Sequence, residues 1–271
     1  MLSPLAPPYA APFDAIAADY DEVFTYSKIG QAQRFAVWKE LENAFPAGSR
    51  VLEVGCGTGV DACFLAEQGV QVIACDSSPG MIRVAERRVR SDATGKIELR
   101  VLAAENIATL TDQAPLDGAF SNFGALNCVE NLKPFAANLA PLLKPKATVL
   151  LCCLGPFCVW EVFWYLAHGE LRKAFRRQRR GGATGRLAPG ASIRVQYPPV
   201  RRLARTFAPW FRLVSWKGVG IVVPPSYVEP FLGRFPKFLQ FASRLDDLLE
   251  GCPGIRILSD HILLKFERED A

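Results

Sequence analysis

Apolar segments of strand length alternate with amphipathic segments of helix length through residue 154, and this alternation constrains the fold of the 271-residue chain most strongly. Short runs rich in valine and isoleucine indicate buried strands, whereas apolar residues three or four positions apart indicate helices. Repeated strand–helix units form a parallel sheet covered by helices on both faces. The predicted strands are 50–55, 70–76, 97–104, 117–124 and 147–154.

The segments before and after this core are expected to complete a single domain, 1–271. After residue 154 the alternation becomes irregular, with one long helix predicted over 158–177 and a short extra strand at 192–197. The expected parts of the domain are an N-terminal helical lid (13–45), the core (49–154), two substrate-side insertions (155–200 and 223–252) and the last sheet elements (201–222 and 257–268).

Three alternating glycines, Gly55, Gly57 and Gly59, stand at the turn between the first strand and the next helix in VLEVGCGTGVDACFLA. Glycines at such a turn let the backbone approach a ligand closely. Asp76 ends the second strand, about 20 residues after the turn, where a carboxylate can accept hydrogen bonds from both hydroxyls of a ribose. The combination predicts a cofactor that contains adenosine.

The glycine pattern separates two classes of cofactor. A dinucleotide site would read G-x-G-x-x-G, whereas this turn reads G-C-G-T-G with Glu53 two residues ahead of it. At this point the sequence resembles the class I S-adenosylmethionine-dependent methyltransferases of the small-molecule type. The resemblance rests on LEVGCGTG, VIACDSSPGMIRVAERR, LAAENI, DGAFSNFGALNCVENL and LLKPKATVLL. It implies a Rossmann-like seven-stranded α/β sheet, a lid made of the N-terminal helices and the C-terminal insertions, and S-adenosyl-L-methionine as cofactor.

The same resemblance implies which residues hold the cofactor. The glycine turn would line the amino acid part of the cofactor, and Asp76 would bind its ribose. The segment after the third strand would flank the adenine. Tyr20 would close over the cofactor, and Arg34 would meet the methionine carboxylate. The residues implied are Tyr20, Arg34, Glu53, Gly55, Cys56, Gly57, Asp76, Ser77, Met81, Ala104, Glu105, Ser121 and Asn122.

Two departures from the family pattern accompany these matches. Ala103 stands where the family often has an acid, so that Glu105, Asn106 or the backbone would recognise the adenine amino group. The turn before the fifth strand reads Pro145–Lys146–Ala147 where two glycines usually follow the proline. We interpret the second departure as variation without loss of function.

The sequence offers few groups for acid–base chemistry. Methyl transfer to a hydroxyl that starts protonated needs a base, and the candidates are His168, His261 and Tyr197, with Asp260 or Asp246 to orient His261. A structural role is the alternative for each of them. No metal site is predicted, because the chain has two histidines and no C-x-x-C pair.

The charge distribution points to an anionic partner. From Leu171 to Val228 the sequence has no Asp or Glu but thirteen lysine and arginine residues. A solvated basic face, an acidic group on the substrate, an anionic membrane surface or nucleic acid would each explain this 171–217 basic tract. Interleaved aromatic residues favour lipid over nucleic acid. The nine aromatic residues that would pack the insertions or cover an apolar substrate are Phe157, Trp160, Phe163, Trp164, Trp210, Trp216, Phe231, Phe235 and Phe238.

These observations predict methyl transfer to a hydrophobic, acidic small molecule or lipid-like intermediate, on oxygen. An RNA methyltransferase is a weaker alternative, because SNFG stands where an N-P-P-Y motif would be expected. A cofactor-binding protein without transfer activity is the other alternative. With no signal peptide expected in Met1–Pro12 and no run of about 18 uncharged apolar residues, the expected location is cytoplasmic, with peripheral association at the membrane.

Overall fold

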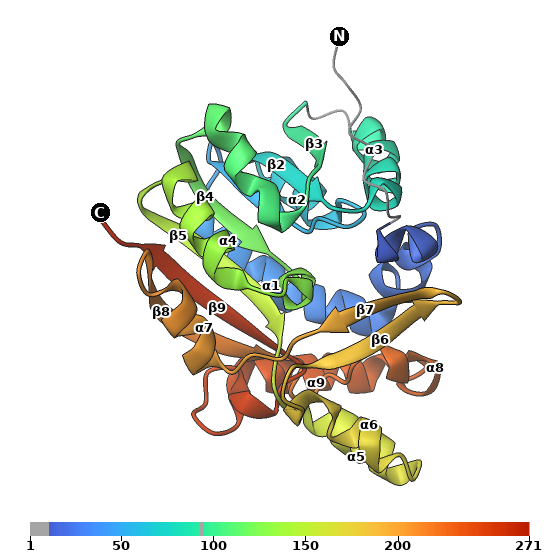
Figure 1. Cartoon of the computed structure of the whole chain (residues 1–271). Helices are drawn as coiled ribbons and strands as arrows, with labels where there is room; N and C mark the ends of the chain where they lie inside the picture. Colours follow the sequence, from blue (N-terminus) through green and yellow to red (C-terminus); the bar gives the residue numbers. More distant parts are fainter. Residues whose placement is uncertain (1–10, 93–94, 271) are drawn as a thin grey trace.

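The strands with the most buried side chains lie in the middle of a seven-stranded sheet of order β3–β2–β1–β4–β5–β9–β8 (Figure 1). The computed structural model describes residues 11–92 and 95–270. The first five strands are parallel, and β9 runs antiparallel between β5 and β8. The strands are β1 (Arg50–Val54), β2 (Gln71–Asp76), β3 (Ile97–Val101), β4 (Leu116–Ser121), β5 (Leu143–Leu154), β8 (Phe211–Val219) and β9 (His261–Arg268). The predicted seven-stranded α/β sheet is confirmed.

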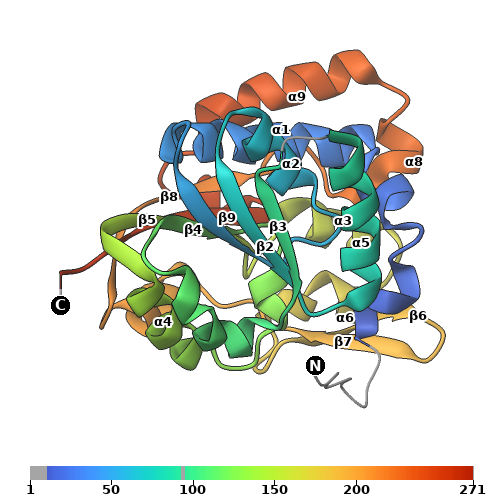
Figure 2. The same cartoon turned by 90° about the horizontal axis from the view of Figure 1, so that it is seen from above.

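Successive side chains of β1 point to opposite faces of the sheet, and helices pack on both faces. Val51 packs in a core with α1 (Lys28–Ala44), α2 (Val60–Glu67) and α3 (Pro79–Asp92). Leu52, on the opposite face, packs in a core with α4 (Leu132–Leu139) and α7 (Val200–Phe207). Seen from above, α1 and α2 lie on one side of the sheet and α4 on the other (Figure 2). The strand order reverses between β1 and β4, which is where open α/β sheets bind ligands.

The N-terminal segment is less regular than the sequence predicted. A short 3₁₀ helix (Pro12–Ile16) and a π-helical turn (Asp21–Thr25) precede α1. The Ser27 side chain begins α1 by accepting a hydrogen bond from the Gly30 amide. The apolar spacing across 13–45 therefore belongs to two short helical turns and to the 17-residue helix α1.

The region after β5 contains an arm and a hairpin that stand outside the sheet. The predicted helix over 158–177 is broken at Gly169, whose φ is +72°. The break leaves α5 (Val159–Ala167) and α6 (Leu171–Ala174), which extend away from the sheet and which we call the arm (Figure 1). The extra strand predicted at 192–197 is present as β7 (Ala191–Val195), and it pairs with β6 (Ala183–Ala188). The sequence missed β6, because ATGRLA lacks a run of apolar residues.

The remaining helices lie in the second insertion and in the short connections between strands. α8 (Glu229–Leu232) and α9 (Pro236–Leu249) lie in the second insertion, and α9 packs on α1. β3 ends at Val101, so that LAAENI leads into a 3₁₀ helix instead of extending the strand. The short 3₁₀ helices are Ala104–Gln113, Ala125–Cys128, Ala140–Leu142, Arg176–Gln178, Ser226–Val228 and Arg256–Leu258.

The structure also bears on the expectations about membrane-spanning helices and metal sites. No helix within residues 11–92 and 95–270 is long and apolar enough to cross a bilayer. Over the same described residues, no group of three or more His, Cys, Asp or Glu side chains is arranged to hold a metal ion. The expectation about a signal peptide falls mainly on residues 1–10, which lie outside the described residues.

Candidate functional site

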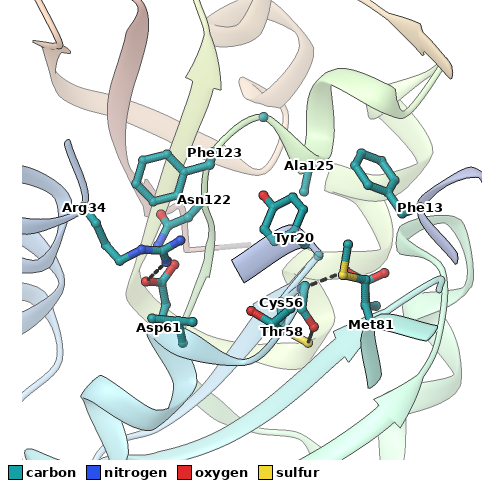
Figure 3. Close-up of a pocket in the computed structure, with 15 residues that line it drawn as sticks. Phe13, Tyr20, Arg34, Cys56, Thr58, Asp61, Met81, Asn122, Phe123 and Ala125 are labelled. Carbon is teal, nitrogen blue, oxygen red and sulfur yellow. Dashed lines mark hydrogen bonds and ion pairs between the residues drawn. The ribbon is translucent and has the colours of Figure 1, made fainter. Parts of the chain in front are cut away.

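A cleft opens at the carboxyl ends of β1, β2 and β4. It consists of two adjoining hollows, of about 110 Å³ and about 160 Å³, that share Phe13, Gly55, Asp76 and Ala125. Arg34, Asp61 and Asn122 lie at one end, Phe13 and Met81 at the other, and Tyr20 lies between them (Figure 3). The lining contains eleven of the thirteen predicted cofactor residues: Tyr20, Arg34, Gly55, Cys56, Gly57, Asp76, Ser77, Met81, Ala104, Glu105 and Asn122.

The glycine turn forms the floor of the cleft, and its first position needs a glycine for two reasons. Gly55 has a φ of +74°, and a Cβ on it would lie 2.2 Å from the Cβ of Ala125. The Gly57 amide donates to Asp76 Oδ2 at 2.9 Å, and the Ser78 amide donates to Asp76 Oδ1 at 2.8 Å. These bonds fix the carboxylate of Asp76 at the boundary of the two hollows. Burial raises the pKa of Asp76 above its ordinary value, although the two amides oppose this shift.

A buried polar cluster closes one end of the cleft. Arg34 and Asp61 form an ion pair (Figure 3). Trp38 Nε1 donates to Asp61 Oδ1 at 2.7 Å, and Asn122 Nδ2 donates to Asp61 Oδ2 at 2.8 Å. Arg34 Nε and Asn122 Oδ1 have no hydrogen-bond partner among the described residues. The sequence analysis missed Asp61, although its place in the first turn after the glycines was a signal that could have identified it.

Glu53 lies beneath this cluster and does not line the cleft. Its backbone pairs with Ala74 and Phe120 on the neighbouring strands, and its side chain is buried. Burial raises the pKa of Glu53 well above its ordinary value, and the charge of Asp61 adds to this shift more than Arg34 offsets it. Within the described residues, Oε2 of Glu53 has no hydrogen-bond partner. Glu53 is therefore placed to respond to a positive charge in the cleft.

The N-terminal segment covers the glycine turn through two aspartates. Asp14 Oδ1 accepts from Ser78 Oγ and from the Gly80 amide, both at 2.6 Å. Asp21 Oδ1 accepts from Thr58 Oγ1 at 2.7 Å. These bonds place Phe13 and Tyr20 on the cleft. Enclosure raises the pKa of Tyr20 to about 12, so its hydroxyl stays protonated at neutral pH.

The end of β4 separates the cleft from a second group of polar residues. Ser121 is buried, its Oγ has no partner within the described residues, and it does not line the cleft. Phe123 does line it, and its φ of +49° is uncommon for a side chain of this size. One side of the Phe123 ring faces the Arg34 guanidinium at 4.8 Å, and the His261 ring meets it edge-on at 5.5 Å. The sequence analysis did not single out Phe123.

The three predicted base candidates lie in different surroundings. His168 is exposed on the arm, where its Nδ1 lies 2.7 Å from the Trp164 carbonyl oxygen. Tyr197 lies against the guanidinium of Arg177 at 5.4 Å. His261 is buried, and its ring contacts a residue that lines the cleft. The structure therefore brings His261 close to the cleft and leaves His168 away from it.

Asp260, and not Asp246, is the carboxylate beside His261. His261 Nδ1 lies 3.3 Å from Asp260 Oδ2. Asp246 instead accepts the amides of residues 221–223. Burial alone would raise the pKa of Asp260, but His261 and Arg177 hold it well below its usual range. Asp260 therefore carries its charge at neutral pH.

Two arginines of the 171–217 basic tract, Arg176 and Arg177, bind buried acids, so the tract is not a solvated basic face along its whole length. Arg177 Nη2 donates to Asp260 Oδ1 at 2.6 Å and to Glu161 Oε2 at 2.9 Å. Arg176 binds Glu161 through two hydrogen bonds of 2.8 Å. Glu161 lies on α5 and Asp260 lies directly before β9, and both acids are buried. Arg177 binds both of them and thereby joins α5 to the start of β9.

Comparisons with known proteins agree with this geometry. Residues 51–146 match the model of the methyltransferase domain family. A demethylmenaquinone methyltransferase from Clavibacter sepedonicus is 32% identical over 143 residues, which cover 53% of this chain and 56% of that protein. A ubiquinone biosynthesis O-methyltransferase from Xanthomonas axonopodis pv. citri is 37% identical over 117 residues, 41% of this chain and 45% of that protein. The chain thus spans about half the length of the curated relatives it matches.

A solved structure extends the similarity in fold beyond the matched segment. The CcbJ methyltransferase from Streptomyces caelestis aligns with a TM-score of 0.62 and 16% identity, over 96% of this chain and 99% of that one. The sheet order, the glycine turn and the family match support the same assignment. Residues 51–146 therefore match the methyltransferase domain family, and the fold of the whole chain is similar to that of a solved methyltransferase.

Proposed function

We propose that the chain is a class I S-adenosylmethionine-dependent methyltransferase, and that it transfers a methyl group to a hydroxyl oxygen of a hydrophobic, acidic small molecule or lipid-like intermediate. The observation that carries this proposal is that Phe123 contacts both the cofactor cleft and the buried His261–Asp260 pair. The Phe123 side chain thus lies between the cleft and the His261–Asp260 pair. The relatives are named for demethylmenaquinone and for ubiquinone biosynthesis, and one of these names specifies an O-methyltransferase. These names support a hydrophobic acceptor and oxygen as the acceptor atom.

The residues of the cleft fit the cofactor. When bound, S-adenosylmethionine supplies an electrophilic methyl group next to a positive sulfonium. The close approach at Gly55 and the oriented carboxylate of Asp76 suit a ribose and its neighbouring backbone contacts. The unpartnered atoms of Arg34 and Asn122 provide a donor and an acceptor for the zwitterionic end. Tyr20 and Phe13 would exclude water from above, and the segment 13–25 would act as the lid.

His261 is our assignment for proton acceptance. Asp260 holds a negative charge beside its ring, and Arg177 holds Asp260 in place. Phe123 would have to turn aside for an acceptor hydroxyl to reach His261, and its strained backbone is consistent with a residue that has two positions. Proton removal of this kind contributes about 10²–10⁴-fold to a rate, and alignment of the reacting groups contributes about 7–11 kcal/mol.

A panel of acceptors tests the proposed function. The chain is incubated with S-adenosylmethionine that carries a labelled methyl group, and with hydrophobic phenols, hydrophobic carboxylic acids and matched amines. We expect label in phenol ethers, identified by mass spectrometry, and a preference for phenols that also carry an acidic group. Label only in amines would overturn the oxygen assignment. Tight cofactor binding without transfer to any acceptor would favour a binding protein over an enzyme.

Replacing Asp76 with alanine should weaken cofactor binding. The change removes a charged hydrogen-bond acceptor and leaves the Gly57 and Ser78 amides without their partner. We expect a loss of about 1–3 kcal/mol in the binding free energy, measured by isothermal titration calorimetry. Asp112→Ala, at an exposed carboxylate, is the matched control and should bind as the unmodified chain does. Unchanged affinity in a folded Asp76→Ala variant would show that the ribose assignment is wrong.

Cofactor binding should release a proton from Glu53. In the unliganded chain the raised pKa keeps this acid protonated over a wider pH range, and positive charge in the cleft favours the ionised form. Affinity should therefore rise as pH increases toward and through the raised pKa, because the bound state holds fewer protons. Calorimetry in buffers of different ionisation enthalpy measures the release, and Glu53→Gln should abolish it. Equal proton release in both proteins would assign the proton to another group.

A further inference from the structure

Large apolar side chains are exposed on the arm and on the neighbouring α8. Phe163 is 67% exposed on α5, Leu171 is 64% exposed at the start of α6, and Phe175 is 47% exposed at its end. Phe231 of α8 is 57% exposed, and its ring lies 5.1 Å from that of Trp164 on α5. The arm and α8 therefore carry neighbouring exposed apolar groups. Soluble proteins rarely leave such groups together unless something covers them.

The charges on this part of the chain are almost all positive. With Arg176 and Arg177 bound to buried acids, three other arginines of the arm region are exposed: Arg172, Arg179 and Arg180. No acidic side chain within the described part of the chain forms an ion pair with these three. Lys173 does pair, with Glu170 at 2.5 Å. α8 is followed by two further exposed cations, Arg234 and Lys237.

The arm is firmly attached, which distinguishes it from a loose insertion. Glu161 of α5 binds both Arg176 and Arg177, and Arg177 also donates to the Asp260 carbonyl oxygen at 2.8 Å. These buried bonds join the arm to β9, beside the His261–Asp260 pair. A ligand held on the exposed end of the arm would thus have a fixed position relative to the cleft.

We propose that the arm and α8 form a docking surface for an anionic lipid bilayer. Aromatic and aliphatic side chains enter the boundary between headgroups and acyl chains, and arginines bind the anionic headgroups around them. A protein partner would need acidic side chains placed opposite these arginines. An anionic bilayer offers negative headgroups all over its surface and needs no such matched positions. The inference rests on the proposed function only where it names the bilayer as the source of the hydrophobic acceptor. Docking itself is measurable without turnover.

Vesicle flotation tests the docking surface in the full chain, without any acceptor present. The probes are phosphatidylcholine vesicles with and without phosphatidylglycerol, at low and at physiological salt. We expect binding to the anionic vesicles, weaker at the higher salt. The double variant Phe163→Gln, Leu171→Gln and the triple variant Arg172→Gln, Arg179→Gln, Arg180→Gln should each lower the partition coefficient by at least about tenfold.

Matched controls on other helices separate docking from general stickiness. Arg201→Gln, Arg202→Gln, Arg205→Gln removes three exposed charges from α7, and Phe241→Gln, Leu248→Gln removes two exposed apolar groups from α9. Both controls should alter partitioning by less than about twofold. Equal losses in arm and control variants would overturn the proposal, as would no binding to anionic vesicles. Sedimentation that shows a dimer abolished by the arm variants, without vesicle binding, would assign the surface to a second copy of the chain.

The two proposals fail in different ways. All variants should retain unchanged cofactor affinity by calorimetry, which confirms that they are folded. Vesicle binding that depends on the arm, together with no methyl transfer to any acceptor, would support docking and contradict the proposed function. Transfer to a hydrophobic phenol without vesicle binding would support the proposed function and contradict docking.

Discussion

His261→Asn is expected to lower kcat by about 10²–10⁴-fold for a phenolic acceptor while cofactor affinity stays unchanged. Asparagine preserves polarity at this buried position but cannot take up a proton. The variant should lose least with acceptors that are already ionised, such as carboxylates. Its rate with phenols should rise with pH up to the pKa of the phenol, because the hydroxyl then needs no base. Steady-state kinetics across a series of phenols of different pKa measures both effects.

The matched control for this prediction is His168→Asn, at the exposed histidine of the arm. It should retain full activity, because its ring bonds the Trp164 carbonyl away from the cleft. Equal losses for phenol and carboxylate acceptors would assign His261 a structural role. Equal losses in the His261→Asn and His168→Asn variants would also assign His261 a structural role.

Arg177→Met is expected to lower the free energy of unfolding by about 3–5 kcal/mol, because it leaves two buried carboxylates without their shared cation. Those carboxylates are Glu161 and Asp260. Urea unfolding monitored by circular dichroism measures the difference. Arg180→Met, at an exposed arginine nearby, should change stability by less than about 0.5 kcal/mol.

The pH dependence of this difference follows from the depressed pKa of Asp260. A carboxyl whose pKa is lower in the folded state stabilises the fold above its unfolded pKa, and this stabilisation is lost as pH falls. Without Arg177 the buried Asp260 becomes neutral more easily, so the variant should approach the unmodified chain in stability between neutral and mildly acidic pH. A difference that grows on acidification would contradict the assigned role of Arg177.

The cofactor half of the site could be predicted because its signals are local in the sequence. A strand, a glycine turn and a carboxylate at the next strand end determine their own proximity, since neighbouring parallel strands end at the same edge. Gly55, Gly57 and Asp76 therefore lie where the pattern predicted them. Glu53 and Ser121 are the exceptions, because both are buried in the sheet and neither lines the cleft.

The acceptor half could not be predicted in the same way, because its contacts join distant segments. Arg177 and Asp260 are 83 positions apart, and no local pattern shows that this arginine turns inward while Arg179 stays exposed. Phe123 has a left-handed backbone and contacts the ring of His261, which lies far away in the sequence. The hairpin partner β6 has too few apolar residues for periodicity to detect it.

The bonds of Asp14 and Asp21 to the glycine-turn region set a kinetic condition on the catalytic cycle. Phe13 and Tyr20 line the same cleft that these aspartates hold shut. If the segment 13–25 acts as the proposed lid, used cofactor leaves and fresh cofactor enters while this segment is detached. The frequency of detachment therefore sets an upper limit on turnover, however fast the methyl group moves. A chain with weakened Asp14 and Asp21 contacts would exchange cofactor sooner but protect the reacting groups from water less well.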